Sequence, residues 1–387
     1  MIGHMKKRKV ARHFSAWIAW GIAVLLLGGS LAISVKRVHA GPGAQFYKQL
    51  NLVSDIPHLA IRTDPNLVNP WGVAFSPTSP FWIADNGTGV STLYGPTGKP
   101  FPKKSPLVVT IPPPPDSTET GNPTGMVFNG TSDFVVTNGS SSGPGRFIFA
   151  NENGTISGWN PQVNLTEAVV KVNNSASEAI YKGLALGSNV SGNFLFATNF
   201  HTGAVDMFNS EFIPVGSFTD PNLPALFAPF GIRNIGGQLY VTYAKKETAD
   251  SGDDEPGPGN GFVDVFDTTG TLIRRFASQG TLNSPWGLAL APANFGQFSN
   301  DLLVGNFGDG RINAFDTSGN FLGQLQDNKG NPISIEGLWA LTFGNDGLAG
   351  SSHTLFFTAG IDHEDHGLFG RIKALPERAG EGEDDDD

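Results

Sequence analysis

The residues best suited to chemistry in this sequence are histidines and carboxylates that gather in one short stretch, Asp362–His366. His363 and His366 are three residues apart, and their ring nitrogens could bind Zn²⁺ or Cu²⁺ together with Glu364 or Asp365. The spacing differs from the His-Glu-x-x-His pattern, in which a helix presents two histidines on one face. The sequence therefore predicts a histidine cluster carried by a loop, with a metal site as one of its uses.

A further histidine, His201, lies in the stretch Asn199–Gly203. Because histidine titrates near neutral pH, His201, His363 and His366 could together act as a general base. That arrangement would make the protein a hydrolase or a lyase. The sequence contains no nucleophile elbow, phosphate-binding loop or dinucleotide fingerprint, so it does not indicate those other chemistries.

The framework that must position these loops repeats along the chain. Each repeat opens on a short apolar run with an early glycine or tryptophan, followed by two more apolar runs separated by Gly, Asn, Asp or Pro. The period is roughly 50 residues, which is typical of propeller blades. The opening runs are 69–75, 122–128, 181–186, 229–232, 285–288 and 337–341. The pattern predicts an all-β, six-bladed propeller of four-stranded antiparallel blades.

The two ends of the repeat array predict how the ring closes. The stretch 46–53 has the character of a strand but has no blade of its own, and the sixth blade ends one strand short near Ala374. We expect the N-terminal strand to complete the last blade, since this leaves no open blade interface. In the second blade, 134–139 is the predicted second strand. The stretches Thr63–Leu67 and Thr219–Leu223 share the sequence TDPNL and are predicted to be equivalent turns.

Residues 1–40 have the pattern of an export signal. A positive region, Lys6–Arg12, precedes the apolar stretch Phe14–Val35, and Val38-His-Ala40 offers small residues for cleavage. The apolar stretch of about 22 residues would also span a bilayer, so residues 14–35 could instead remain as a membrane anchor. We therefore expect residues 41–376 to form the propeller outside the cytoplasm, secreted, periplasmic or at the cell surface. The acidic tail, 377–387, is expected to be disordered.

Composition limits the partners. There is no cysteine, hence no disulfide framework and no thiolate metal site. Seven basic residues lie in residues 1–40, which contain no acid, and without them 18 basic residues face 35 acidic ones, a net charge of −17. Such a charge argues against nucleic acid as a partner, and against a membrane unless the N-terminal segment stays attached. We expect a monomer whose partner is a small molecule, a glycan or a protein.

The repeat motif resembles that of NHL-type six-bladed propellers. The residues that carry the resemblance are a P-x-G-[IVL] motif in the first strand of a blade and a later G-x-[IV]-x-x-[FY] motif. That group includes gluconolactonase-like hydrolases, paraoxonase-like lactonases, streptogramin lyases and peptide-amidating lyases. The stretches NLVSDIP, DPNLVNPWG, FGDGRINAFD and HGLFGRI are similar to those of a family of exported bacterial proteins with no assigned activity, over 46–375. The resemblance implies a fold and not a reaction.

The resemblance also implies which side chains face the mouth of the central channel, namely those just before the glycine of each first strand. Here they are Trp71, Thr124, Lys182, Phe230, Trp286 and Trp339. Gluconolactonase-like members hold a divalent metal there with Asn or Asp and with the Glu of an E-G-P motif. Only Glu336 matches, and a single carboxylate is a poor site for Ca²⁺, which takes six or more oxygens. No cofactor is predicted, although Ca²⁺ or Zn²⁺ would be the ions to expect if one were held.

Two alternatives stay open for these positions. The rings of Trp71, Phe230, Trp286 and Trp339, with Lys182 beside them, could bind a sugar or an apolar ligand. They could equally pack between blades as part of the core. A second set, at the ends of the second strands, could line the channel or could hold the following turn in place through side-chain hydrogen bonds. Its members are Asp85, Asn138, Asn199, Tyr243 and Asn306.

The resulting hypothesis is a binding module that uses the channel mouth. The alternative is a hydrolase or lyase, because streptogramin lyases use histidine and glutamate to abstract a proton. Its catalytic candidates are His201, His363, His366 and Glu336, and its metal candidates are His363, His366 and Asp365.

Overall fold

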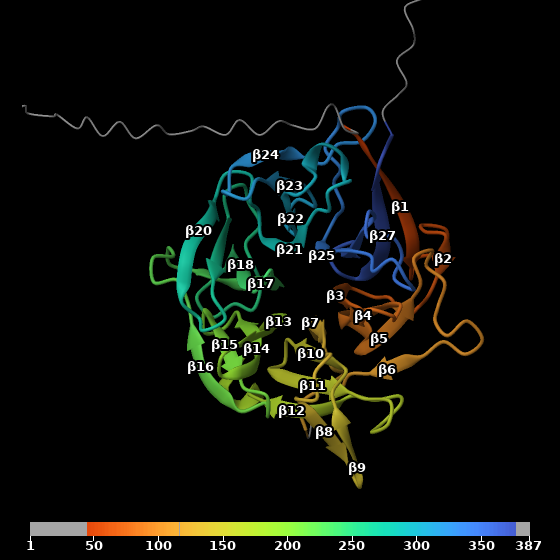
Figure 1. Ribbon diagram of the computed structural model, residues 1–387, viewed down its shortest axis with the longest axis vertical. Helices are drawn as coiled ribbons and strands as arrows, with labels where there is room; N and C mark the ends of the chain where they lie inside the picture. The colour runs from red at the N-terminus through yellow and green to blue at the C-terminus, as the bar shows by residue number, and fades with distance from the viewer. Residues whose placement is uncertain (1–44, 116, 377–387) are drawn as a thin grey trace, which may run out of the picture. The chain divides into compact units, whose positions relative to one another are not determined.

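The computed structural model describes residues 45–115 and 117–376. Over these residues the strands form six sheets of four or five strands arranged around a common centre (Figure 1), together with one separate two-stranded sheet, so the predicted six-bladed propeller is confirmed. The predicted export signal (1–40), the possible anchor (14–35) and the acidic tail (377–387) lie outside the described residues. Within the described ranges, no helix is both long enough and apolar enough to cross a membrane.

The first three blades follow one another along the chain, each with its first strand at the hub. They consist, from the hub outward, of β3 (Pro70–Ala74), β4 (Phe81–Asp85), β5 (Val90–Tyr94) and β6 (Val108–Thr110); β7 (Pro123–Phe128), β10 (Phe147–Asn151), β11 (Thr155–Trp159) and β12 (Val169–Asn173); and β13 (Tyr181–Asn189), β14 (Gly192–Asn199), β15 (Ala204–Phe208) and β16 (Pro214–Phe218).

The remaining three blades repeat the same order. They consist of β17 (Phe227–Ile235), β18 (Gln238–Lys245), β19 (Gly261–Phe266) and β20 (Leu272–Ser278); β21 (Pro285–Leu290), β22 (Leu302–Asn306), β23 (Ile312–Phe315) and β24 (Phe321–Gln324); and β25 (Leu338–Phe343), β26 (Leu355–Ile361), β27 (His366–Ala374), β1 (Tyr47–Ser54) and β2 (Arg62–Thr63). Three short 3₁₀ helices, Asn86–Thr88, Ser175–Ser177 and Gly296–Phe298, lie between strands.

The N-terminal strand closes the ring as the sequence predicts. β1 pairs antiparallel with β27, from Tyr47 opposite Ala374 to Ser54 opposite Leu368. The short strand β2 then adds to β1 in parallel. The first and last described strands therefore lie side by side in one sheet (Figure 1).

The predicted second strand of the second blade was wrong. Residues 134–139 instead contribute β8 (Val135–Asn138), which pairs with β9 (Ser141–Pro144) in a separate two-stranded hairpin that projects from the blade (Figure 1). The second strand is β10, paired with β7 and β11. Both segments are short apolar runs, and such a run alone does not say which of them joins the blade.

Apolar side chains fill the spaces between neighbouring blades. Trp82 of the first blade stacks on Phe147 of the second, with ring centroids 4.2 Å apart. Ile148 of the second blade packs with Leu184 and Leu195 of the third. Because each blade buries its faces only against its neighbours, the sheets stabilise one another in a closed ring.

The glycine that follows five of the six hub residues has a steric cause, whereas Ala340 follows Trp339. A Cβ atom on Gly72 would lie 2.4 Å from the carbonyl oxygen of Thr124, and one on Gly231 would lie 2.2 Å from that of Trp286. At these two positions the first strands of adjacent blades approach too closely to admit a side chain. This explains why the P-x-G motif marks the start of a blade.

The two TDPNL turns are equivalent, as predicted. Asp64 accepts a hydrogen bond from the backbone N–H of Asn66, and Asp220 accepts one from that of Asn222. The second oxygen of Asp64 accepts the hydroxyl of Tyr94, whereas that of Asp220 pairs with Arg275. Each turn thus anchors a loop to a neighbouring buried strand.

Candidate functional site at the channel mouth

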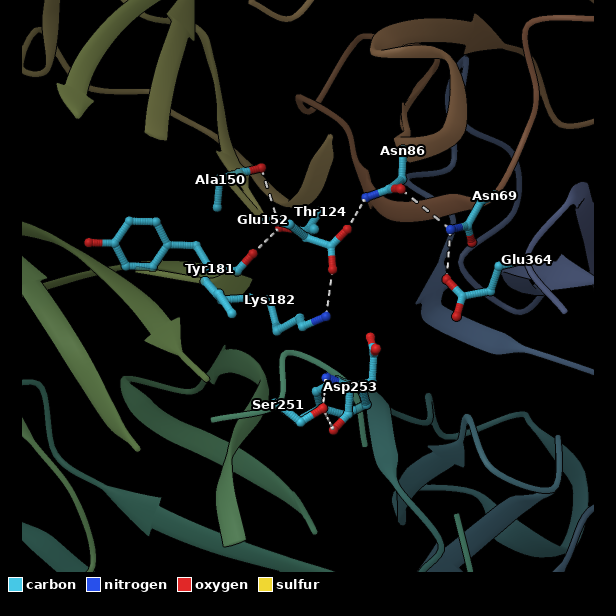
Figure 2. Close-up of polar contacts among 12 residues, drawn as sticks. Asn69, Asn86, Thr124, Ala150, Glu152, Tyr181, Lys182, Ser251, Asp253 and Glu364 are labelled. Carbon is cyan, nitrogen blue, oxygen red and sulfur yellow. Dashed lines mark hydrogen bonds and ion pairs between the residues drawn. The ribbon is translucent and has the colours of Figure 1, made fainter. Parts of the chain in front are cut away.

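The loops that join second and third strands bring polar side chains to the mouth of the channel. Asn86 follows β4, Glu152 follows β10, and Glu364 lies between β26 and β27. Asp253 comes from the longer loop between β18 and β19. Figure 2 shows these side chains around Lys182, which reaches inward from β13. The site is therefore assembled from at least five blades.

Lys182 is the cation of this site. Its side chain is only 4% exposed, and its Nζ lies 2.5 Å from Oε1 of Glu152. Burial on its own would lower the pKa of Lys182, but the ion pair with Glu152 and the nearby carboxylates of Asp253 and Glu364 raise it above its ordinary value. Lys182 is therefore charged and already neutralised by Glu152.

Two amides extend the network from Glu152 toward Glu364. The other oxygen of Glu152, Oε2, accepts a hydrogen bond of 2.8 Å from Nδ2 of Asn86. Nδ2 of Asn69 donates to Oε2 of Glu364 at 2.7 Å, while its Oδ1 accepts the indole N–H of Trp339 at 3.0 Å. Figure 2 shows Asn86 and Asn69 between the two carboxylates. The amide orientations are thus fixed by partners on both sides.

Glu364 reaches the mouth from a strained loop. Asp362, His363 and Glu364 all have left-handed backbones, with φ of 53°, 57° and 70°. Asn69 has φ of 44° although it precedes a proline, which disfavours helical conformations in the preceding residue. Strained residues of this kind gather at functional sites, where the surrounding structure holds them in place.

The protonation of Glu364 is set by burial. Burial raises its pKa to about 7, the repulsion from Glu152 adds to this rise, and the Asn69 hydrogen bond and Lys182 oppose it. Burial also raises the pKa of Asp254, a second carboxyl of the loop between β18 and β19. Glu364 therefore exchanges its proton near neutral pH, as a general acid or base does.

Aromatic rings occupy the rest of the hub. Trp71 and Trp339 stack with ring centroids 3.5 Å apart, and Trp286 meets both of them edge-on at 6.3 and 5.8 Å. Phe307 stacks on Trp339 at 4.1 Å, and Phe230 lies 5.7 Å from Trp339. The Nζ of Lys182 lies 5.0 Å from the Trp71 ring centroid, as in a cation–π contact.

The structure thus brings the predicted hub residues together. Trp71, Phe230 and Trp339 are buried, as is Lys182, whereas 9% of Trp286 is exposed. Thr124 donates a hydrogen bond of 2.7 Å to the carbonyl of Tyr181 in the next blade. The rings pack on one another as a hydrophobic cluster, as expected if they belong to the core between the blades. That they bind a ligand remains a prediction.

A cavity of about 530 Å³ opens beside the mouth and shares Glu152 with it. His201, Glu178, Glu119 and Asp250 also line this cavity. His201 Nε2 lies 3.8 Å from Oε2 of Glu178, and its carbonyl accepts a hydrogen bond from Lys246. Acidic side chains therefore outnumber basic ones here as well.

The other histidines occupy different surroundings. Nδ1 of His366 lies 2.6 Å from Oδ2 of Asp55, and this carboxylate raises the pKa of His366. His363 and Asp365 are exposed, and Glu336 accepts the backbone N–H of His363 at 3.4 Å. Among the described residues, no group of three or more His, Asp or Glu is arranged to hold a metal ion.

Most of the second-strand ends are engaged in local hydrogen bonds, whereas the hydroxyl of Tyr243 is buried without a hydrogen-bond partner among the described residues. Asp85 accepts the hydroxyl of Thr92 at 2.7 Å, and Asn306 donates to the carbonyl of Thr281 and to Asp309. Asn199 accepts the backbone N–H of Thr202. In the second blade Asn151, and not Asn138, holds this position, and it donates to Thr155.

Sequence reasoning missed Glu152, Asn86 and Asn69, and it named Glu364 only as a metal ligand. Glu152 directly follows Asn151, just as Asn86 follows Asp85, so the residue after each second-strand end was the signal that could have found them. In the third and fifth blades the same position holds Phe200 and Phe307. The mouth therefore has a polar part and an aromatic part.

Comparison with known protein families gives no match. Two proteins of Acanthamoeba polyphaga mimivirus, both described as uncharacterised, are similar over 330 residues. R648 is 34% identical, over 83% of this chain and 78% of its own length, and L690 is 31% identical, over 83% and 84%. The sequence resemblance pointed to bacterial proteins, whereas these relatives are viral.

Solved structures with the same fold include a streptogramin B lyase and virginiamycin B lyase from Staphylococcus aureus. The first has a TM-score of 0.50 at 14% identity and covers 85% of this chain and 98% of the lyase. The second has a TM-score of 0.50 at 17% identity and covers 85% and 99%. At such identities the likeness concerns the fold alone.

Proposed function

This chain belongs to the same family as R648 and L690 of Acanthamoeba polyphaga mimivirus, and we propose that it is a ligand-binding propeller whose channel mouth recognises a small organic cation. The observation that carries this proposal is the charge balance of the mouth. Its cation, Lys182, is already paired with Glu152. Within the described residues, no basic side chain forms an ion pair with Glu364, Asp253 or Asp254.

A protonated amine would supply the missing positive charge. Unpaired carboxylates are costly when they are withdrawn from water, so a cationic ligand gains from pairing with them. One carboxylate oxygen of Glu364 is not bonded to Asn69. Asp253 is exposed and lies on the side of Lys182 away from Glu152 (Figure 2). Because the ligand would compete with the proton on Glu364, its affinity should rise with pH near 7.

The aromatic part of the mouth supports an organic ligand over a bare metal ion. Phe307 is partly exposed beside the buried Trp339, and ring faces attract organic cations. The neighbouring 530 Å³ cavity, with its carboxylates, has the size of a small-molecule site and could take the rest of the ligand. Amino sugars and aliphatic amines both fit this chemistry.

We place this binding outside the cytoplasm, on the pattern of residues 1–40. In the alternative arrangement, residues 14–35 anchor the propeller to a membrane. Expression with a C-terminal epitope tag, followed by fractionation and N-terminal sequencing, tests both. A mature N-terminus near Gly41 supports release, whereas an intact N-terminus in the membrane fraction supports the anchor, and an intact protein in the cytosol contradicts export.

Ligand pairs that differ in charge test the binding proposal. We expect glucosamine to bind more tightly than glucose, and 1,5-diaminopentane more tightly than 1,5-pentanediol, by isothermal titration calorimetry at pH 7.5. Glu364→Gln, which keeps the shape of the side chain and removes its charge, should weaken the binding of the charged ligands at least tenfold. Glu211→Gln removes an exposed carboxylate from the outer edge of the third blade and should change nothing. Equal binding of charged and neutral partners, or none by either, would contradict the proposal.

A second candidate, acid–base catalysis by a hydrolase or lyase, is favoured by one observation. Glu364 has a pKa of about 7, the value suited to proton transfer at neutral pH, and it lies in the same network as the buried Lys182. This moves the catalytic role from the histidines to the carboxylate. In a screen of lactones and cyclic esters, an activity that Glu364→Gln abolishes and His366→Gln retains would support it. An activity that survives Glu364→Gln would contradict it.

A further inference from the structure

A second cavity lies farther along the channel, beyond the hub residues. It has a volume of about 450 Å³, and all six first strands contribute to its wall. Its lining begins one or two residues after the hub residues, for example at Gly72, Gly125 and Leu184. Trp286 borders the cavity, and its indole N–H donates to the carbonyl of Lys182 at 3.2 Å. The hub cluster therefore lies next to both compartments.

One charged side chain lines this cavity, Arg233 of β17. Its Nη1 donates to the carbonyls of Leu288 and Leu341 at 2.8 and 2.6 Å, and its Nη2 donates to the hydroxyl of Thr342 at 3.2 Å. These acceptors belong to the fifth and sixth blades, so the guanidinium is held across the channel in one orientation. Burial lowers the pKa of Arg233 to about 10, which leaves it charged at neutral pH.

Arg233 has no anionic partner. In the residues that the structure describes, it forms no ion pair with any carboxylate. A guanidinium has five N–H donors, and three are used by Leu288, Leu341 and Thr342. Two donors remain for a ligand. Arg233 is half-buried, and a charge that is partly withdrawn from water without a counter-charge is costly, so a bound anion would reduce that cost.

The other side chains of the cavity wall are apolar or already hydrogen-bonded within the protein. Asn234 donates to the carbonyl of Leu186 and accepts from the backbone N–H of Gly237. The other side chains are mainly aliphatic or aromatic, among them Phe75, Phe128 and Leu341. A cavity of this volume with one fixed polar group is typical of a site for a small, mostly apolar ligand.

We propose that this cavity binds a small organic anion, a monocarboxylate with an apolar body, through Arg233. The two free donors of the guanidinium pair with the carboxylate, a charge-assisted contact that is stronger than one to a neutral group. The apolar body lies against Phe75, Phe128 and the aliphatic wall. The site is separate from the acidic mouth and has the opposite charge preference, so the protein would carry two sites of complementary chemistry along one axis.

The sequence contains a signal for this site. Arg233 is the third residue after the hub residue Phe230, and the same position in the other blades holds small or uncharged residues. They are Ala74, Val127, Ala185, Ala289 and Thr342. The other five blades therefore pack without a charge at this position.

Octanoate is the probe that tests the proposal on the full-length protein. We expect saturable binding of octanoate by calorimetry, with a change in the fluorescence of Trp286, and at least tenfold weaker binding of octanol and octylamine. Arg233→Gln should weaken the binding of octanoate at least tenfold and leave the binding of octanol unchanged. Equal affinities for octanoate and octanol, or no saturable binding of octanoate, would mean that Arg233 only cross-links the blades, and would overturn the proposal.

A second variant covers the case in which Arg233→Gln fails to fold. Ala74→Leu enlarges a side chain of the wall and leaves Arg233 in place, so it should weaken octanoate several-fold. Glu364→Gln, at the mouth, should leave octanoate binding unchanged, which separates this site from the proposed cation site. Octanoate binding that Ala74→Leu leaves intact but Glu364→Gln alters would place the ligand at the mouth and contradict the proposal.

Discussion

The indole N–H of Trp339 donates a hydrogen bond of 3.0 Å to Oδ1 of Asn69, joining the last blade to the first. Both residues are almost completely buried. Since the same amide donates to Glu364, one asparagine fixes an aromatic ring of the hub and a carboxylate of the mouth. The stability of the ring and the geometry of the site therefore depend on a shared contact.

Asn69→Leu should reduce the free energy of unfolding by about 1–3 kcal/mol, because it leaves the buried N–H of Trp339 without an acceptor. Denaturant unfolding followed by tryptophan fluorescence measures this change. Asn320→Leu is the matched control, since Asn320 also donates to a carboxylate, Asp316, but on an exposed turn. A loss no larger at position 69 than at position 320 would show that the contact with Trp339 contributes nothing.

The elevated pKa of Glu364 predicts a stability that falls with rising pH. The folded state holds this proton up to about pH 7, whereas the unfolded chain releases it near 4.5. The folded state thus binds more protons between these values, so the stabilisation is complete below pH 4.5 and is lost as the pH rises through 7. The total should be on the order of 3 kcal/mol, since one pKa unit corresponds to about 1.4 kcal/mol.

Glu364→Gln isolates this contribution, because glutamine does not titrate. The difference in unfolding free energy between wild type and Glu364→Gln, measured at intervals from pH 4.5 to 8, should move steadily in favour of the variant. A difference that stays constant over that range would mean that Glu364 titrates normally in the folded protein.

Removing the ammonium of Lys182 should raise the pKa of Glu364 further. Lys182 lowers this pKa by attraction, whereas Glu152 raises it by repulsion, and Lys182→Met removes the attraction while the repulsion remains. Carbon-detected NMR titration of the Glu364 carboxyl in wild type and variant measures the change. Lys171→Met, which removes a lysine from the outer strand β12, should leave the titration unchanged. A fall of the Glu364 pKa in Lys182→Met would contradict the proposed network.

Leu52→Ala should destabilise the ring at its closure. Leu52 is completely buried in β1, where it packs with Phe81 and Phe369, and truncating a buried leucine costs roughly 2–5 kcal/mol. We expect a lower midpoint of thermal unfolding, measured by circular dichroism. Gln49→Ala, on the same strand but only partly buried, should shift the midpoint much less. Equal shifts would mean that β1 adds little to the core.

The fold could be predicted because its signal is local and repeated. The Pro-Trp-Gly sequence of β3 and β21 marks the start of a first strand. The close approach that requires glycine at position 72 recurs in each blade that has a glycine at this position. The exception was the second blade, where Val135–Asn138 and Phe147–Asn151 have equally good strand patterns. Which one pairs with β7 depends on register and on contacts with the third blade, which a short window does not contain.

The site was harder to predict because it is not local. Glu152 and Lys182 meet from different blades, and Asn69 and Glu364 are almost 300 residues apart in the chain. His363 and His366, in contrast, are close together in the sequence, yet His366 pairs with Asp55 and His363 is exposed. Closeness in the sequence was therefore a poor guide to the site, because its residues come together only in the folded ring.

The pairing of β1 with β27 also has a consequence for biosynthesis. Of the described strands, β1 is synthesised first and its partner β27 last, so β1 stays unpaired until the other described strands have left the ribosome. Five blades can form in the order of their synthesis, whereas the sixth is completed only when β27 has been made.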